Sequence, residues 1–396
     1  MNKAILNIEI QEFINTNINS DITSILLKGT QFSNVQTKEI ASQIEAKKRC
    51  KTKLSSWFKA EKIYYPNKLN IEQTSSEITA DYKAKIIEGN SIIDLTGGFG
   101  VDCYYFSKHF KNVIHCEIDK SLSEIADHNF EQLQVSNVET KNIDGISFLN
   151  QTSQHYDWIY IDPSRRHDSK GKVFFLKDCL PNVPKNIETL FKHSKNILIK
   201  TSPLLDISVG INELKHVKSI HIVAVSNEVK EILWILEDQY EDKITIKTVN
   251  INKDKQECFS FILNSESTSH VEYSIPLAYL YEPNVAILKS GAFKTVSAKL
   301  NLFKLHQHSH LYTSEELIDF PGRCFKIDKI LPYNKQKINK ESITKANITI
   351  RNFPESVEKI RKKLKIKEGG NMYLFFTKDI KDNHIVIVCS KHNDSF

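Results

Sequence analysis

The 396-residue chain has no apolar stretch as long as the roughly 18 residues that a membrane-spanning helix needs. Near the N-terminus, Glu9 interrupts the apolar residues before the core of a signal peptide could form. These two absences argue against a membrane protein and against an exported one. We therefore expect a cytoplasmic protein.

Glycine, proline and paired cysteines are also scarce. Only 12 glycines and 10 prolines are present, which excludes a collagen-like or linker-dominated chain. The seven cysteines are odd in number, and no two of them have CxxC spacing. A disulfide framework or a zinc site is therefore not expected, and free thiols fit best.

The composition is that of a globular protein of two or three domains, with 40% hydrophobic and 26% charged residues. The net charge of +6 hides an uneven distribution. Residues 91–284 contain 20 basic and 27 acidic residues, whereas residues 285–396 contain 21 and 11. A strongly basic C-terminal part on an acidic middle suggests a body with an arm that binds a polyanion.

Residues 1–75 have a helical pattern. From residue 76, β-branched runs alternate with helical stretches, which predicts a parallel, doubly wound α/β sheet. Strands are expected at 91–96, 112–117, 138–143, 158–161 and 196–200, with a helix across 176–191. Two further strands, 220–225 and 232–236, are only six residues apart and must be antiparallel. We assign 76–245 to this domain.

The remaining chain is predicted to form two smaller α+β parts. Residues 246–325 form a β-rich connection, and residues 326–396 form a compact basic unit. The segment His306-Gln307-His308-Ser309-His310 could bind a metal, but it has no cysteine or carboxylate beside it, and no metal site is predicted.

A glycine-rich turn follows the first predicted strand and is the strongest functional signal. It reads Asp94-Leu95-Thr96-Gly97-Gly98-Phe99-Gly100-Val101-Asp102. Glycines at this carboxyl edge let the backbone approach a ligand closely. The third glycine of a dinucleotide motif is replaced by Cys103, and a P-loop sequence is absent. The remaining D-x-x-x-G-x-G pattern is typical of S-adenosylmethionine sites.

Acidic residues also end the next two strands. Glu117-Ile118 follows the second strand, where a carboxylate can accept both ribose hydroxyls. Asp144-Gly145 follows the third, where a carboxylate can accept the adenine amino group. Three acids at successive strand ends support S-adenosylmethionine as the cofactor.

The fourth strand ends in Asp162-Pro163-Ser164-Arg165-Arg166. This is where amino-methylating enzymes carry a D/N-P-P-aromatic sequence. An exocyclic amine is a poor nucleophile, and a carboxylate with a backbone carbonyl can hold its N–H groups and orient its lone pair. We predict catalytic roles for Asp162, Pro163, Ser164 and Arg165. Because Arg165 replaces the aromatic residue, the base could stack on Arg165 or on one of four aromatic residues: Trp57, Tyr64, Phe174 or Phe175.

The Asp94 and Asp162 motifs resemble those of bacterial class I methyltransferases with a C-terminal THUMP-like domain. Further segments of the chain are similar to that family: residues 73–84, 282–293, 309–312, 320–323 and 345–354. The resemblance implies a Rossmann-like, seven-stranded methyltransferase sheet, a ferredoxin-like piece within 246–325 and a THUMP-like domain at 326–396. By analogy with THUMP domains, it also implies an RNA substrate.

Basic residues in the tail are consistent with RNA binding. Arg361, Lys362, Lys363, Lys365 and Lys367 place five cations in seven residues. They could hold phosphates while the pocket selects the base. The leading hypothesis is a methyltransferase for a base amino group, guanine N2 first, in tRNA or rRNA. The alternatives are a methyltransferase for a protein or small molecule, and a non-catalytic RNA-binding protein.

Overall fold

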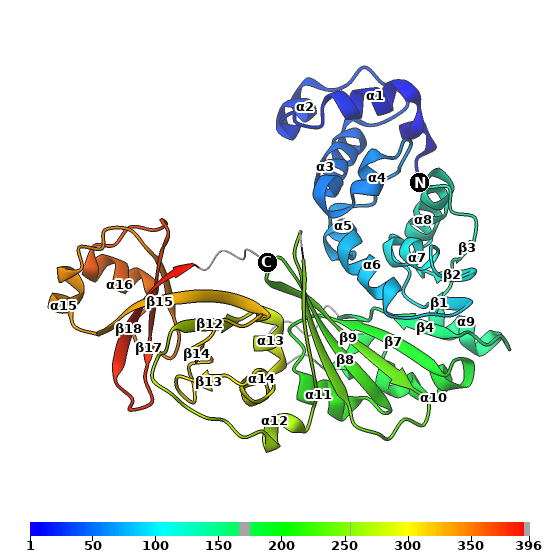
Figure 1. The fold of residues 1–396 in the computed structure, drawn as a ribbon. Coiled ribbons are helices and arrows are strands. Elements are labelled where there is room, and N and C mark those ends of the chain that lie inside the picture. Colours follow the sequence, from blue (N-terminus) through cyan, green and yellow to red (C-terminus); the bar gives the residue numbers. More distant parts are fainter. Residues whose placement is uncertain (166–174, 254, 392–396) are drawn as a thin grey trace. The chain divides into compact units, whose positions relative to one another are not determined.

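The computed structural model of the chain describes residues 1–396 except 166–174, 254 and 392–396 (Figure 1). The chain divides into two compact units. The first contains residues 1–218 and 230–242, and the second contains residues 219–229 and 243–396.

The first unit begins with the helical region that the sequence pattern predicted. Its helices are η1 (Lys3–Leu6), α1 (Ile8–Thr16), α2 (Ile22–Lys28), α3 (Thr37–Lys53), α4 (Ser55–Lys59), α5 (Lys68–Gln73) and α6 (Glu77–Lys85). Polar caps set several of their starts; Asp21, for example, accepts the Ser24 amide at 2.9 Å. An isoleucine-rich cluster that includes Ile10, Ile40 and Ile44 forms a small core between α1, α2 and α3.

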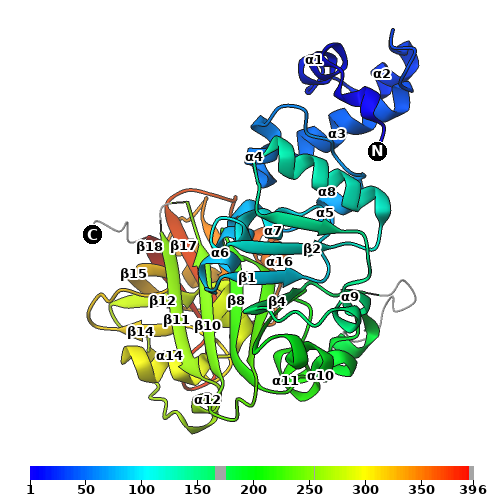
Figure 2. The ribbon, with the colours of Figure 1, turned by 90° about the vertical axis from the view of Figure 1, so that its right-hand side faces the viewer.

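The large sheet contains the predicted parallel strands. They are β1 (Ser91–Asp94), β2 (Asn112–Cys116), β3 (Val138–Lys141), β4 (Trp158–Ile161) and β7 (Asn196–Thr201). Figure 2 shows β1, β2 and β4 side by side. Strand β9 (Glu228–Glu237) is antiparallel to β7. The helices between these strands are α7 (Val101–Phe106), α8 (Lys120–Gln132), α9 (Gly145–Gln151), α10 (Val183–His193) and α11 (Ile207–Glu213).

The sheet has nine strands rather than the expected seven, in the order β11-β10-β8-β9-β7-β4-β1-β2-β3. In the second unit, β10 (Thr245–Ile251) pairs in parallel with β8 (Val217–Val225), and β11 (Gln256–Ile262) is antiparallel to β10. These two strands satisfy backbone groups that β8 would otherwise leave exposed at a sheet edge. The fold class is nevertheless the predicted α/β class, with a Rossmann-like mixed sheet.

The helix predicted across 176–191 was wrong in its first part. Residues Leu176–Asp178 form a 3₁₀ turn, and β6 (Cys179–Leu180) pairs with β5 (Ser164–Arg165). Helix α10 starts only at Val183, where Asn182 accepts the Lys185 amide at 3.0 Å. Pro181 has no N–H and would clash inside a helix, so it ends the possible helical run on that side.

The second unit contains a seven-stranded sheet in the order β13-β14-β12-β15-β18-β17-β16. Its strands are β12 (Tyr279–Pro283), β13 (Phe303–Lys304), β14 (Tyr312–Ser314), β15 (Gly322–Pro332), β16 (Asn347–Ile350), β17 (Met372–Lys378) and β18 (His384–Lys391). Its helices, with those before the sheet, are α12 (Ser265–Thr268), α13 (Val285–Ser290), α14 (Phe293–Leu300), α15 (Lys335–Lys340) and α16 (Val357–Leu364). Buried residues of β17, β18 and α16, among them Phe376, Val386 and Ile360, form one of its cores.

Candidate active site

The glycine-rich turn joins β1 to α7, and the Asp94 side chain holds this turn through hydrogen bonds. Asp94 is fully buried, and its Oδ1 accepts the Thr96 amide at 2.8 Å and the Thr96 hydroxyl at 3.1 Å. The Cys103 thiol lies 3.4 Å from the other carboxylate oxygen. Burial raises the pKa of Asp94 to about 8. Asp94 therefore shapes the turn from inside the protein and has no exposed surface of its own.

Two glycines of the turn are required by its geometry. Gly98 has a φ of +57°, and a Cβ there would meet only the Thr96 carbonyl oxygen, at 3.7 Å. Its outer face is therefore open. A Cβ on Gly97 would lie 2.3 Å from the His115 ring, which packs beneath the turn. Burial lowers the pKa of His115 to about 4, so this imidazole is neutral at physiological pH.

Glu117 ties the next strand end to this turn. One oxygen of its half-buried carboxylate accepts the Gly98 amide at 2.9 Å, and the other accepts the Asp119 amide at 2.7 Å. Each oxygen keeps a second lone pair for a ligand hydroxyl. Ile118, the next residue, is 72% exposed and offers an apolar surface beside that carboxylate.

The third acid, Asp144, caps helix α9. Its Oδ1 accepts the Ser147 amide at 2.8 Å, and the side chain is half-buried. Gly145 packs against the turn after β1, because a Cβ there would lie 2.5 Å from the Leu95 carbonyl oxygen. The structure thus brings the turn, Glu117 and Asp144 to the same edge of the sheet, where the sequence placed them.

Asp162 and Pro163 follow β4 directly beside the turn. The Asp162 amide donates to the Thr96 hydroxyl at 2.7 Å, which links the two motifs through a single side chain. Pro163 is buried, and Ser164 is exposed in β5. Arg165 lies in β5, opposite Cys179, while Arg166 lies outside the described residues.

Lys200 is a site residue that the sequence reasoning missed. It lies on β7, beside β4, and its ammonium forms an ion pair with Asp162 Oδ2. The Lys200 side chain is 12% exposed and that of Asp162 is 33% exposed. Burial alone would lower the pKa of Lys200, but Asp162 first, then Glu231 and Asp102, outweigh it and raise that pKa. The Lys200 ammonium is therefore charged at neutral pH. The sequence signal that could have found it is a lysine near the end of the strand predicted at 196–200, which pairs with the strand before Asp162.

A buried ion network continues from Lys200 into the unit. The ammonium of Lys83, on α6, has no exposed surface and lies 3.2 Å from Asp102 on α7 and 2.9 Å from Glu231 on β9. Asp102 also accepts hydrogen bonds from the Ser75 hydroxyl at 2.8 Å and the Tyr160 hydroxyl at 3.0 Å. Burial would raise the pKa of Asp102, but Lys83 and Lys200 hold it below the usual value. Asp102, predicted to contact the cofactor, belongs to this internal network.

The candidates for stacking on a base are now distinguishable. Trp57 is fully buried and packs against Phe99 of the turn and against Tyr104, so it supports the turn and presents no face to a base. Tyr64 is half-buried, and its amide donates to Asn129 Oδ1 of α8 at 3.0 Å. Phe175 is half-buried, and Lys177 lies over its ring. Phe174 lies outside the described residues.

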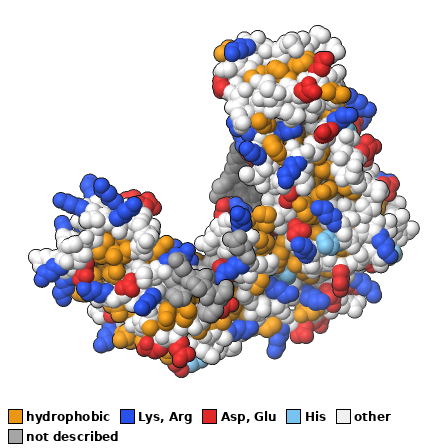
Figure 3. Space-filling model, turned by 45° about the horizontal axis from the view of Figure 1, so that its top comes forward, with side chains coloured by type: hydrophobic (Ala, Val, Ile, Leu, Met, Phe, Trp, Pro, Cys, Tyr) orange, Lys and Arg blue, Asp and Glu red, His pale blue; other side chains and the backbone are white. Residues whose placement is uncertain are grey.

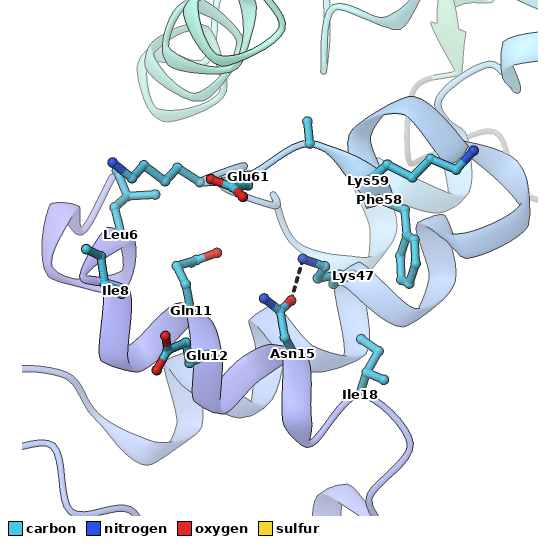
Figure 4. A pocket seen from close by; sticks show the side chains of 12 residues that line it. Leu6, Ile8, Gln11, Glu12, Asn15, Ile18, Lys47, Phe58, Lys59 and Glu61 are labelled. Carbon is cyan, nitrogen blue, oxygen red and sulfur yellow. Dashed lines mark hydrogen bonds between the residues drawn. The ribbon is translucent and has the colours of Figure 1, made fainter.

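The residues fit S-adenosylmethionine in chemical type. A glycine with positive φ and an open outer face, a carboxylate beside an exposed isoleucine, and a capped acid at the third strand end can hold the amino acid, ribose and adenine parts of that molecule. A pocket of about 460 Å³ in the helical region lies elsewhere, between α1 and the α4 segment (Figure 4). Its lining, including Asn15, Lys47 and Phe58, shares no residue with the turn.

The basic residues of the C-terminal part lie mainly on the surface. Lys and Arg side chains gather over the lobe of α15 and α16 (Figure 3). Its exposed lysines are Lys335, Lys337, Lys340, Lys345, Lys359, Lys362, Lys363, Lys365 and Lys367. Arg361 differs from them because its guanidinium donates to the Ala346 carbonyl at 3.2 Å, which gives it a structural role.

The histidine segment connects β13 to β14 and is not a strand. His306 pairs with Asp382 at 3.2 Å, and His310 stacks on Phe293 with ring centroids 3.6 Å apart. Within the described ranges, no group of three or more His, Cys, Asp or Glu side chains is arranged to hold a metal ion. In the same ranges, no helix is both long and apolar enough to cross a bilayer.

Comparisons with known proteins identify the C-terminal parts. A ferredoxin-like domain family matches residues 279–321, and a THUMP domain-like family matches residues 322–391. No curated protein matches the chain.

Three solved structures similar to the chain are described as methyltransferases. The "putative methyltransferase from Porphyromonas gingivalis W83" is 32% identical, with a TM-score of 0.90 over 99% of both chains. The "putative methyltransferase yhhF from Escherichia coli" is 20% identical, with a TM-score of 0.31 over 41% of this chain and 85% of that one. "SMU.1697c, a putative methyltransferase from streptococcus mutans in complex with SAH" is 13% identical, with a TM-score of 0.31 over 41% and 96%.

The last two similarities have low TM-scores and support no conclusion about this chain. The first one extends over nearly the whole of both chains. Together with the two C-terminal matches, it confirms the resemblance that the sequence motifs indicated. The chain belongs to the family of the P. gingivalis protein, the class I methyltransferase-like proteins with C-terminal ferredoxin-like and THUMP-like domains.

Proposed function

We propose that the protein is an S-adenosylmethionine-dependent methyltransferase that acts on a base amino group of RNA, with guanine N2 in tRNA or rRNA as the leading substrate. The single observation that carries the proposal is the hydrogen bond between the Asp162 amide and the Thr96 hydroxyl. It fixes the acceptor motif next to the glycine-rich turn, which is the arrangement that transfer between two bound molecules requires.

The proposed roles of the cofactor residues follow from their contacts. Asp94 and Thr96 hold the turn in shape, and Gly98 keeps its outer face open. Glu117 would accept the ribose hydroxyls while it remains bonded to the turn. Asp144 would bind the adenine amino group with the oxygen that does not cap α9. When bound, S-adenosylmethionine supplies an electrophilic methyl group on a sulfonium.

Asp162 and Pro163 would orient the acceptor. The Asp162 carboxylate and the backbone carbonyl next to the buried Pro163 can accept the two N–H groups of an exocyclic amine, which aligns its lone pair. General-base help from such a carboxylate contributes about 10²–10⁴-fold in other enzymes. Ser164 and Arg165 form β5, which pairs with β6. We propose that these two residues contact the base or its phosphate.

The RNA part of the proposal is supported by the THUMP-like match at 322–391 and by the exposed lysines of the same region. Surface lysines give sequence-independent affinity for phosphates, and the catalytic pocket then selects the base. A base within a duplex would have to be flipped out or presented in a loop.

Isothermal titration calorimetry with S-adenosylmethionine tests the cofactor part. We expect saturable binding to the full-length protein and none to Gly98→Arg. A wild-type protein without detectable binding would favour the non-catalytic RNA-binding alternative.

Filter binding of total RNA across a salt titration tests the RNA part. Binding without a salt slope would contradict the role of the basic region and would favour a protein or small-molecule substrate.

A further inference from the structure

Asp162 does not face the acceptor site as an isolated carboxylate. Its Oδ2 forms an ion pair with Lys200, and among the described residues no hydrogen-bond partner is recorded for its Oδ1. The two carboxylate oxygens therefore differ in their partners. Oδ2 is paired with the Lys200 ammonium, and Oδ1 is available to a ligand.

Lys200 is itself held in place by buried charge. Its side chain is only 12% exposed, and it lies on a central strand of the sheet rather than on a loop. The charged or titratable groups that act on it or on its partner come from four elements or their ends: Asp162 and Tyr160 from β4, Glu231 from β9, Asp102 from α7 and Lys53 from α3. Lys83 from α6 pairs in turn with Asp102 and Glu231. An ion pair of a surface lysine has a mobile geometry and contributes little to stability. The Lys200 ammonium, in contrast, is held in one position by its buried surroundings.

We propose that Lys200 is a positioning residue for the acceptor. It holds the Asp162 carboxylate turned so that only Oδ1 receives a donor, which makes the site select a ligand with an N–H group and disfavour one that presents an acceptor or an anion. This inference rests on the proposed function and extends it, because the D/N-P-P pattern of amino-methylating enzymes says nothing about a lysine on the neighbouring strand.

Two consequences distinguish positioning from a merely structural role. With Oδ2 paired to Lys200, Oδ1 is the oxygen that receives the amine N–H and takes its proton as the methyl group is transferred. A guanidinium can make the same ion pair, whereas a neutral side chain cannot. Lys200→Arg should therefore keep the acceptor in place, and a neutral variant that still folds and binds cofactor should not.

The test uses full-length wild-type protein, Lys200→Met, Lys200→Gln and Lys200→Arg, with total RNA from a strain that lacks the gene as the substrate. Calorimetry with S-adenosylmethionine and the kcat and KM of methyl transfer are measured for each. For the two neutral variants we expect cofactor affinity within about threefold of wild type and kcat lowered at least tenfold. Lys200→Arg keeps the charge and should keep kcat within about threefold of wild type.

The role through Asp162 is tested by a double-variant comparison. Addition of Lys200→Met to Asp162→Asn should change the rate less than twofold, because Asn is neutral and no longer depends on the cation. Independent, multiplicative losses would overturn the inference, as would an unchanged kcat in both neutral variants or an equal loss of kcat in Lys200→Arg. If one neutral variant fails to fold, the other and Lys200→Arg still decide.

A wild-type protein that binds no cofactor overturns the proposed function together with this inference. A working wild type with an unaffected Lys200→Gln overturns the inference alone.

Discussion

The buried ammonium of Lys83 should be a large contributor to the stability of the first unit. Lys83 has no exposed surface and lies between the carboxylates of Asp102 and Glu231, at 3.2 Å and 2.9 Å. Replacement by methionine keeps much of the volume but leaves two carboxylates in the interior without this cation. Removal of one partner from a buried ion pair typically costs about 3–5 kcal/mol of unfolding free energy. We expect Lys83→Met to fall in that range at pH 7.

The matched control is Lys85→Met, two residues further along α6. The Lys85 side chain is 62% exposed and pairs with Asp81 at 2.6 Å, one helical turn away. A surface pair of this kind is worth only about 0.3–0.5 kcal/mol. Both substitutions replace a lysine in the same helix, so their difference reports burial of the charge. Urea unfolding followed by tryptophan fluorescence measures it, since all three tryptophans, Trp57, Trp158 and Trp234, belong to the first unit.

The pH dependence gives a second check. In the wild type the pKa of Asp102 is lowered, so its pairing contributes stability above its ordinary value of 3.8 and loses it on acidification. Burial raises the pKa of Glu231 despite its lysine neighbours. Without Lys83 both carboxyls take up protons more readily, so the destabilisation should shrink between pH 7 and pH 5. A loss no larger than that of Lys85→Met, or an equal loss at both pH values, would refute the reasoning.

Three further results are expected. Gly98→Val should abolish S-adenosylmethionine binding in calorimetry, whereas Gly29→Val, with a φ of +73° and open space around it, should also carry backbone strain, of about 1–3 kcal/mol, and retain binding; equal binding by both variants would count against the turn. Asp162→Ala should lose methyl transfer while it keeps cofactor affinity, and loss of affinity as severe as in Gly98→Arg would show that Asp162 has another role. Neutralisation of three exposed lysines to glutamine should lower RNA affinity and reduce the salt slope in filter binding by about 2–3. The three lysines are Lys362, Lys365 and Lys367. The equal-charge control replaces Lys185, Lys192 and Lys195, exposed in or beside α10, and an equal effect there would argue against a specific role for the basic lobe.

The strands of the first unit could be predicted because their signal is local. Runs such as Trp158–Ile161 are short and apolar, and the six-residue gap between 220–225 and 232–236 is too short for a helical crossover, which predicted an antiparallel pair. The start of α10 was missed because apolar spacing was followed through Pro181, which cannot continue a helix. Strands β10 and β11 were expected in outline, but sequence patterning does not say which sheet edge they join.

The site divides in the same way. Asp94, Gly98, Glu117, Asp144 and Asp162 could be named because each follows a predicted strand, and the ends of parallel strands meet at one edge. Their roles toward cofactor and acceptor stay predictions.

The buried charges could not be named from sequence. Lys83 and Glu231 are separated by 148 residues, and each alone has the appearance of a solvent-exposed charge. Only the three-dimensional structure shows that Asp102 belongs with them and that Lys200 meets Asp162.

The central claim is that this protein methylates a base amino group in RNA. Mass spectrometry of nucleosides from total tRNA and rRNA tests it most directly, in a strain without the gene and in the same strain complemented with wild type or Asp162→Ala. We predict that one N-methylated nucleoside, N2-methylguanosine first, is lost in the deletion strain, restored by wild type and not restored by Asp162→Ala. Identical nucleoside profiles in all strains would contradict it.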